Sequence, residues 1–163
     1  MSMPRRDVLR LVPFTLGLSA IVDGNGFTAM AQTAANKGAE KVTGIGGFFF
    51  RAHDPEALGR WYQERLGISL TPSSYQDPVW RQEAGPTVLS PFPDTTDYFG
   101  DPHKVWMINF RVRDLDKMVA QLRAAKIDVK VDPKTYPNGR FAALHDPEGN
   151  PIQLWQAVNP NAP

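Results

Sequence analysis

Side chains whose spacing suggests acid–base or metal chemistry are few in this chain of 163 residues. The absence of cysteine excludes a thiolate nucleophile, a disulfide and a cysteine zinc site. The three histidines are His53, His103 and His145, and no two have the i, i+2 or i, i+4 spacing with which one strand or helix presents two metal ligands. We therefore expect surface or hydrogen-bonded histidines, and keep only His145, next to an Asp-Pro turn, as a catalytic candidate.

The carboxylate candidate for a general base is Glu83, which lies in a loop-rich central stretch. The sequence shows no partner that would tune Glu83 for proton transfer. The same stretch contains further side chains that could close a pocket: Tyr75, Trp80, Arg81, Tyr98 and Phe99.

Two aspartates 60 residues apart mark the starts of two predicted helices. Asp54 and Asp114 each stand between a strand-like apolar run and a run with helical periodicity, where a carboxylate can cap the first-turn amides. Pro55 suits the first helical position. The apolar residues at helical spacing, which we expect in the core, are Leu58, Trp61, Tyr62 and Leu66 in the first helix and Leu115, Met118, Val119 and Leu122 in the second.

Short strand-like runs separated by proline- and glycine-containing turns surround each predicted helix. The predicted strands are residues 43–51, 68–70, 79–82 and 87–90 in the first half and 105–113, 127–131, 140–144 and 152–155 in the second. We therefore predict an α+β fold of two βαβββ modules, residues 42–100 and 101–158, with a tail at 159–163. Their curved mixed sheet would surround a concave pocket.

Strand alternation predicts which side chains line that pocket. The predicted ligand-binding residues are Phe49, Arg51, Asn109, Arg111, Gln153 and Trp155. Aromatic, amide and guanidinium groups together suit a planar or acidic small molecule. For Arg51 and Arg111 the alternative is a structural ion pair or exposure at a strand end, and the sequence favours neither.

The first 31 residues have the layout of an export signal. Arg5 and Arg6 precede a mostly apolar run, residues 11–22, that is too short to span a bilayer, and a small-residue cleavage site ends at Ala31. The stretch RRDVLR is similar to the twin-arginine export motif. We expect cleavage after Ala31, a flexible lead at 32–41, and a periplasmic or secreted protein without a membrane segment. The alternative is an ordinary N-terminal amphipathic helix.

The charge balance gives no sign of a polyanionic partner. The predicted signal removes three arginines and two aspartates from the 18 basic and 17 acidic residues, which leaves 15 of each. A neutral chain without a basic run is not typical of nucleic-acid binding, so a small molecule or a protein is the expected partner.

The order of elements and three motifs resemble the vicinal oxygen chelate superfamily, which includes glyoxalase I, bleomycin- and fosfomycin-resistance proteins and extradiol dioxygenases. The motifs are DPEALGRWYQERLG, FRVRDLDKMVAQLRAAKIDV and GRFAALHDPEGNPIQLWQ, and the resemblance spans about residues 42–158. The resemblance implies the paired-module fold. Within the superfamily, the chain is similar to the glyoxalase/bleomycin-resistance type. A shared fold does not by itself imply glyoxalase activity.

The resemblance also implies where a metal would be held, by His, Glu or Gln side chains on the first and last strand of each module. The corresponding positions here are Gly47, Val88, Met107 and Gln153. Only Gln153 offers an oxygen, and a neutral amide is a weak single ligand for a hard cation. We therefore expect that the usual metal site is lost and predict no cofactor.

Three functions remain open from the sequence. The first is an exported, metal-free protein that binds or modifies a small aromatic or anionic molecule. The second is a metal-dependent lyase, isomerase or dioxygenase with a displaced site. The third is an accessory domain whose concave face binds a protein segment. A homodimer is compatible with each.

Overall fold

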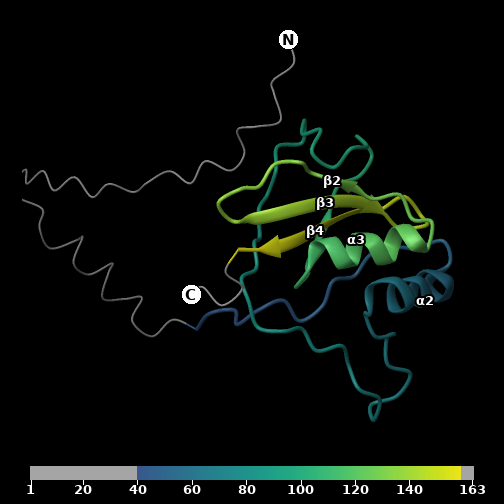
Figure 1. Cartoon of the computed structure of the whole chain (residues 1–163). Helices are drawn as coiled ribbons and strands as arrows, with labels where there is room; N and C mark the ends of the chain where they lie inside the picture. The colour runs from purple at the N-terminus through teal and green to yellow at the C-terminus, as the bar shows by residue number, and fades with distance from the viewer. Residues whose placement is uncertain (1–39, 159–163) are drawn as a thin grey trace, which may run out of the picture. The chain divides into compact units, whose positions relative to one another are not determined.

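The computed structural model describes residues 40–158 (Figure 1). The chain divides into two units, Met1–Phe50 and Arg51–Pro163, which are described separately. In the first unit, residues 40–50 form neither a helix nor a strand. The predicted signal sequence and its cleavage site lie outside the described residues. In the part of the chain that is described, no helix is long and apolar enough to cross a membrane.

Both predicted helices are confirmed, together with their caps. Helix α2 comprises Pro55–Leu66, and the side chain of Asp54 accepts a hydrogen bond from the backbone N–H of Ala57. Gly67 ends α2 in the left-handed conformation, at φ 71°, which glycine adopts without steric cost. Helix α3 comprises Leu115–Ala124, and Asp114 caps it in the same way. In each case the cap satisfies an N–H that has no partner within the helix.

The second half of the chain forms the predicted βαβββ unit. Its strands are β1 (Ile108–Arg111), β2 (Lys130–Val131), β3 (Gly139–His145) and β4 (Pro151–Ala157). They form a sheet in the order β1-β4-β3-β2, with β1 parallel to β4 and the other pairs antiparallel. The predicted α+β class and mixed sheet are confirmed.

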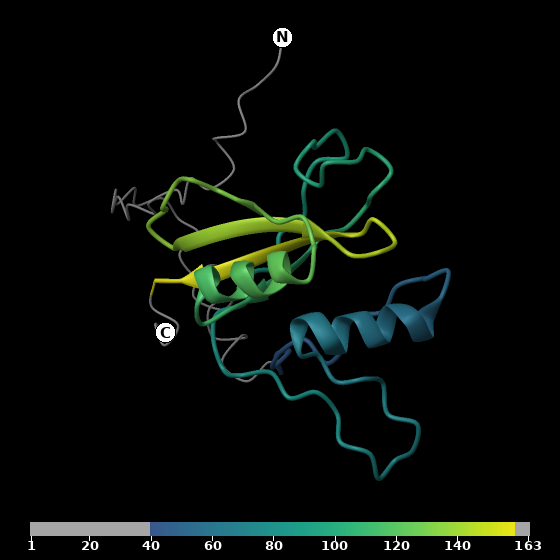
Figure 2. The same cartoon turned by 45° about the vertical axis from the view of Figure 1, so that its right-hand side comes forward.

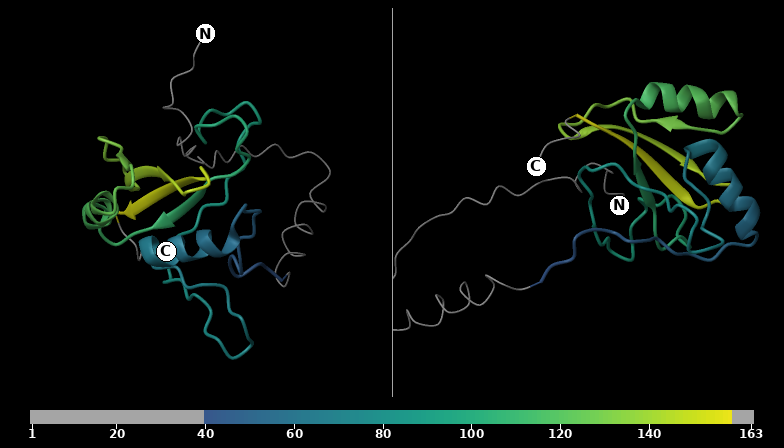
Figure 3. Two further views of the ribbon diagram at one scale, coloured as in Figure 1. Left: turned by 90° about the vertical axis from the view of Figure 1, so that its right-hand side faces the viewer. Right: turned by 90° about the horizontal axis from the view of Figure 1, so that it is seen from below.

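One face of this sheet is covered by helices, as the predicted periodicity requires. The core joins α3 to the sheet, and its fully buried side chains are Leu115, Leu122, Ile152 and Leu154. Three residues of α2, Trp61, Tyr62 and Leu66, pack against the same core. Figure 2 shows α3 lying along β3 and β4. In the right-hand view of Figure 3, α3 lies on one side of the sheet and the teal segment that leads into β1 lies on the other.

The structure differs from the prediction in the first half of the chain. Residues predicted as strands at 43–51, 68–70, 79–82 and 87–90 make no strand pairing within residues 40–158. Pro72, Pro78, Pro86 and Pro91 interrupt this part of the chain, and proline has no N–H for a ladder. Between the predicted strands at 68–70 and 79–82 the chain forms a local turn, in which the carboxylate of Asp77 accepts from the backbone N–H groups of Ser73 and Ser74.

The turn between β3 and β4 fastens α2 to the sheet. Asp146, only 4% exposed, accepts from the hydroxyl of Tyr62 at 2.9 Å, from the backbone N–H groups of Glu148 and Asn150, and from the side-chain amide of Asn150. The carboxylate of Glu148 accepts from the backbone N–H groups of His53 and Asp54 at 2.9–3.0 Å. The bonds from Tyr62, His53 and Asp54 join residues more than 80 positions apart, so the HDPEGN motif has a structural role.

Candidate functional site

The sheet face opposite the helices carries two neighbouring rows of side chains. Strand pairing places Lys130, Ala143, Gln153 and Asn109 in one row, and Phe141, Trp155 and Arg111 in the next. Residues two apart on a strand are about 7 Å apart, and neighbouring strands are separated by about 5 Å. The predicted ligand residues Asn109, Arg111, Gln153 and Trp155 therefore share one face, as the alternation predicted. A polar row lies beside an aromatic row.

Side-chain amides connect the centre of the polar row. The amide nitrogen of Asn109 donates to the side-chain oxygen of Gln153 at 2.6 Å. The amide nitrogen of Gln153 donates to the hydroxyl of Tyr98 at 2.9 Å. Because Gln153 uses both its oxygen and its nitrogen, its orientation is set by its neighbours. The exposed Ala143 beside it projects only a methyl group and leaves space above the sheet.

The aromatic row is held rigidly by the β3–β4 hairpin. Trp155 is 8% exposed and stacks on Phe141 at 6.1 Å between ring centroids and 8° between ring planes. Its indole N–H donates to the carbonyl of Asn138 at 2.8 Å. A side chain at Gly139 would overlap the carbonyl oxygen of Gln156, so only glycine lets the turn approach Trp155 this closely.

A second aromatic group lies in the segment before β1. Phe92 stacks on Tyr98 at 5.1 Å and meets Phe99 edge to face at 5.4 Å. The hydroxyl of Tyr98 joins this group to Gln153. Tyr98 and Phe99 were among the side chains expected to close the site, whereas Tyr75 is fully exposed and Trp80 contacts Phe110, which lies on the helix side of β1.

The sequence analysis did not single out Phe92 or Phe141. The signal that could have identified Phe141 is the alternation of the strand predicted at 140–144. Counted from the buried Ala142 and Leu144, this alternation places Phe141 and Ala143 on the other face. Phe92 stands in a stretch without periodicity, so no pattern in the sequence could have placed it.

Two arginines engage the catalytic candidate Glu83. Arg113 pairs with its carboxylate, and Arg111 donates to its backbone carbonyl at 2.6 Å. The pair with Arg113 is largely exposed and contributes little stability. The structure thus brings Glu83 to the edge of the two rows as an ion-paired group. Arg111 lies at the edge of the sheet face with its guanidinium anchored.

The other predicted site residues are not members of these two rows. Gly47 and Phe49 belong to the first unit, where Phe49 is 94% exposed and its ring lies over Gly47. Arg51 lies in the segment before α2 and lines a different cavity. His145 is exposed at the end of β3, opposite Pro151. By strand alternation His145 lies on the same sheet face as Phe141 and Ala143, so the second catalytic candidate stands one row beyond the polar row.

The family is shown by comparison with known proteins. A model of the glyoxalase-like domain matches residues 47–155, more than half of the chain. The chain belongs to the glyoxalase-like domain family. The predicted resemblance to glyoxalase-like proteins is confirmed by this match, and a solved structure at 22% identity shares the fold.

Three solved structures illustrate how far the likeness of this glyoxalase-like domain extends. TnmS3, an antibiotic binding protein from Streptomyces sp. CB03234, is 22% identical, with a TM-score of 0.50 over 74% of this chain and 100% of that chain. A lactoylglutathione lyase from Agrobacterium tumefaciens is 17% identical, with a TM-score of 0.46 over 72% and 96%. A glyoxalase/bleomycin resistance protein from the same Streptomyces strain is 39% identical, but the match spans only 30% of this chain and 42% of that chain, with a TM-score of 0.28. No curated protein matches the chain.

The residues predicted at the family's metal positions do not offer a suitable donor set in this glyoxalase-like domain. Gly47 has no side chain, Val88 is an aliphatic residue that is 73% exposed, and Met107 offers a soft thioether. The amide of Gln153 is held by Asn109 and Tyr98. Among residues 40–158, no three His, Asp or Glu side chains form a group that could hold a metal ion. These residues do not fit a hard divalent cation, which requires several oxygen or nitrogen donors.

Proposed function

We propose that this glyoxalase-like domain binds a small planar aromatic molecule that carries an acidic group, without a metal ion. The ligand would lie over the two rows of the open sheet face. Its ring system would contact the stacked pair of Phe141 and Trp155, and its polar edge would meet the amides of Asn109 and Gln153. Arg111 would supply the positive charge for the acidic group.

The observation that carries this proposal is the aromatic row beside the amide row. The half-buried ring of Phe141 offers a flat apolar surface supported from behind by the buried Trp155, and the small, exposed Ala143 leaves room for a flat ligand above the polar row. The amides of Asn109 and Gln153 have limited freedom, since each is bonded to the other. Ordered polar groups beside a rigid aromatic surface lose little entropy on binding. Ligand binding through stacking and hydrogen bonds requires no catalytic acid or base.

The relatives are compatible with such a role. TnmS3 has the same fold and is described as an antibiotic binding protein. That description suggests the class of ligand only, because one fold hosts many functions. We propose sequestration of a ring-containing, acidic small molecule as the role of this domain.

The proposal is tested with one aromatic acid and its uncharged analogue. Binding of 2-naphthoate and 2-naphthalenemethanol is measured by isothermal titration calorimetry. We expect tighter binding of the acid, and we expect Arg111→Gln to weaken it about tenfold, the loss of about 1.4 kcal/mol. The alcohol should bind the variant and the native protein equally.

The matched control is Arg140→Gln. Arg140 lies on the helix side of the same sheet and forms a two-point ion pair with Asp116. Its replacement removes the same charge but leaves the proposed site unchanged, so naphthoate binding should persist. Failure of both probes to bind, or equal losses in the two arginine variants, would refute the proposed site.

We also propose that the protein is exported before it binds its ligand. The support is the sequence RRDVLR, followed by a short apolar run and the cleavage site at Ala31. Mass analysis of protein from the periplasm of an expressing bacterium should give a chain that begins at Gln32. Accumulation of the uncleaved chain in the cytoplasm would contradict export.

A further inference from the structure

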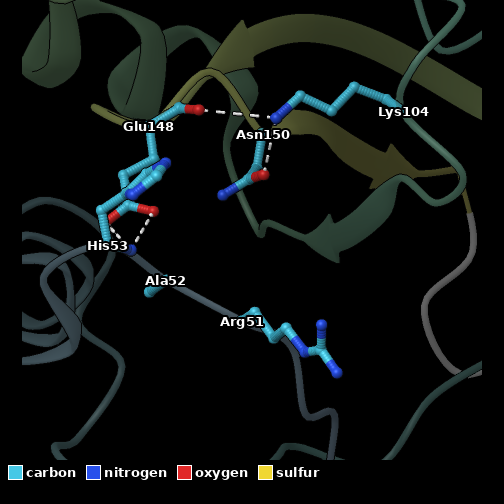
Figure 4. A pocket seen from close by; sticks show the side chains of 6 residues that line it. All are labelled: Arg51, Ala52, His53, Lys104, Glu148 and Asn150. Carbon is cyan, nitrogen blue, oxygen red and sulfur yellow. Dashed lines mark hydrogen bonds between the residues drawn. The ribbon is translucent and has the colours of Figure 1, made fainter.

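A separate cavity lies beside the first turn of α2, at the end of the sheet where β4 begins. Its volume is about 300 Å³, and it is lined by Arg51, Ala52, His53, Lys104, Glu148 and Asn150 (Figure 4). Three chain segments that are far apart in sequence therefore meet here. Ligand cavities of this size are at the small end of the usual range, so a single small group fits.

The one carboxylate in the cavity is already engaged. The two oxygens of Glu148 accept hydrogen bonds from the backbone N–H groups of His53 and Asp54 at 2.9–3.0 Å. These bonds lower the pKa of Glu148 from its ordinary value. Its negative charge is thus balanced by the start of α2, and Glu148 forms no ion pair with the cations of the cavity among the described residues.

Two cations in the cavity have no anionic partner among residues 40–158. The ammonium group of Lys104 donates to the side-chain oxygen of Asn150 at 3.0 Å and to the carbonyl of Glu148 at 3.4 Å. Both acceptors are neutral, and an ammonium group carries a third N–H. Within residues 40–158, Arg51 makes no hydrogen bond or ion pair, and Figure 4 shows its guanidinium directed away from Glu148. The ammonium group of Lys104 is half-buried and has no carboxylate partner among the described residues, so a bound anion would compensate its partly desolvated charge.

We propose that this cavity binds the carboxylate or phosphate group of a small molecule, between the ammonium of Lys104 and the guanidinium of Arg51. Lys104 is the fixed part of the site, because two hydrogen bonds orient it. Arg51 is the adaptable part, and its long side chain can turn over the bound group. Guanidinium groups bind both carboxylate and phosphate oxygens in pairs, so either source satisfies the site.

The site is tested with inorganic phosphate and acetate as probes, added to ¹⁵N-labelled protein at constant ionic strength. We expect saturable shifts at the backbone amides of Ala52, His53 and Asn150 with at least one probe. A response to acetate alone identifies a carboxylate site, and a response to phosphate alone identifies a phosphate site. Shifts that sodium chloride reproduces, or no saturable shift with either probe, would overturn the proposal.

Arg51→Gln separates the site from general charge effects. It should weaken binding about tenfold, which corresponds to about 1.4 kcal/mol. The matched control is Arg60→Gln on the exposed side of α2, where the arginine has only a loose pair with Glu56 at 3.7 Å. Equal affinity of the Arg51→Gln variant and the native protein would refute the proposal. Naphthoate binding on the sheet face is read from the amides of Gln153 and Trp155, so failure of one site leaves the other test intact.

Discussion

Removal of the hydrogen bond between Tyr62 and Asp146 tests most directly how α2 is held against the sheet within the unit Arg51–Pro163. The hydroxyl of Tyr62, on α2, donates at 2.9 Å to a carboxylate 84 residues away that is 4% exposed. Tyr62→Phe removes this donor and keeps the ring. A hydrogen bond to a charged group contributes about 1.5–3 kcal/mol, and we expect about 1.5 kcal/mol because Asp146 keeps three other donors.

The matched control is Tyr136→Phe. Its hydroxyl also donates to an aspartate at 2.9 Å, but Asp132 is only four residues away and half-buried. Water can replace a bond in this position, so the expected cost is below about 0.5 kcal/mol. The comparison therefore holds the chemistry constant and changes only burial and sequence separation.

Urea unfolding, followed by circular dichroism, measures both costs. With a slope of about 2 kcal/mol per M, Tyr62→Phe should lower the midpoint by roughly 0.7 M. Burial, with the nearby charge of Asp146, raises the pKa of Tyr62 above its ordinary value. The hydroxyl's contribution is therefore complete below about pH 10 and is lost as pH rises further, so the two proteins should converge in alkali. Equal losses of unfolding free energy in the two tyrosine variants, or no loss for Tyr62→Phe, would refute the conclusion that this bond stabilises the packing of α2 on the sheet.

Three further predictions concern the hairpin and the sheet face. The pKa of Glu148 is lowered by the N–H groups of Asp54 and His53, so the contribution of its carboxylate to stability is present above about pH 4.5 and is lost as the pH falls below that value. The gap in urea midpoint between the native protein and Glu148→Gln should therefore be constant above about pH 4.5 and narrow below it, and a gap independent of pH would contradict this. Gly139→Ala should cost more than about 2 kcal/mol in the same assay, because φ is 140° and the new methyl group meets the Gln156 carbonyl; a cost below that of Tyr62→Phe would be inconsistent with the tight turn. Gln153→Glu should bind no stoichiometric divalent metal by elemental analysis, since Gly47, Val88 and Met107 would still lack hard donors; tight metal binding in that variant would show that the donors were misassigned.

Local features were predictable because their signals lie within a few residues of one another. The aspartate caps before α2 and α3 depend on N–H groups three positions away, and both form as expected. The placing of Asn109, Arg111, Gln153 and Trp155 on one face follows from strand alternation and was also predicted correctly. The strands predicted in the first half were not, because a strand forms only where another segment pairs with it, and alternation along the chain does not specify that partner.

The sequence alone determined the family, the α+β class, both helices and the contents of one sheet face, since periodicity and capping are properties of neighbouring residues. Only the tertiary structure decided which distant groups meet. It joined Glu148 to the start of α2, paired Glu83 with Arg113, brought Tyr98 to Gln153, and placed Arg51 and Lys104 in the lining of one cavity. Such contacts depend on how the chain closes long loops around a common core, and no pattern of residues along the chain specifies that geometry.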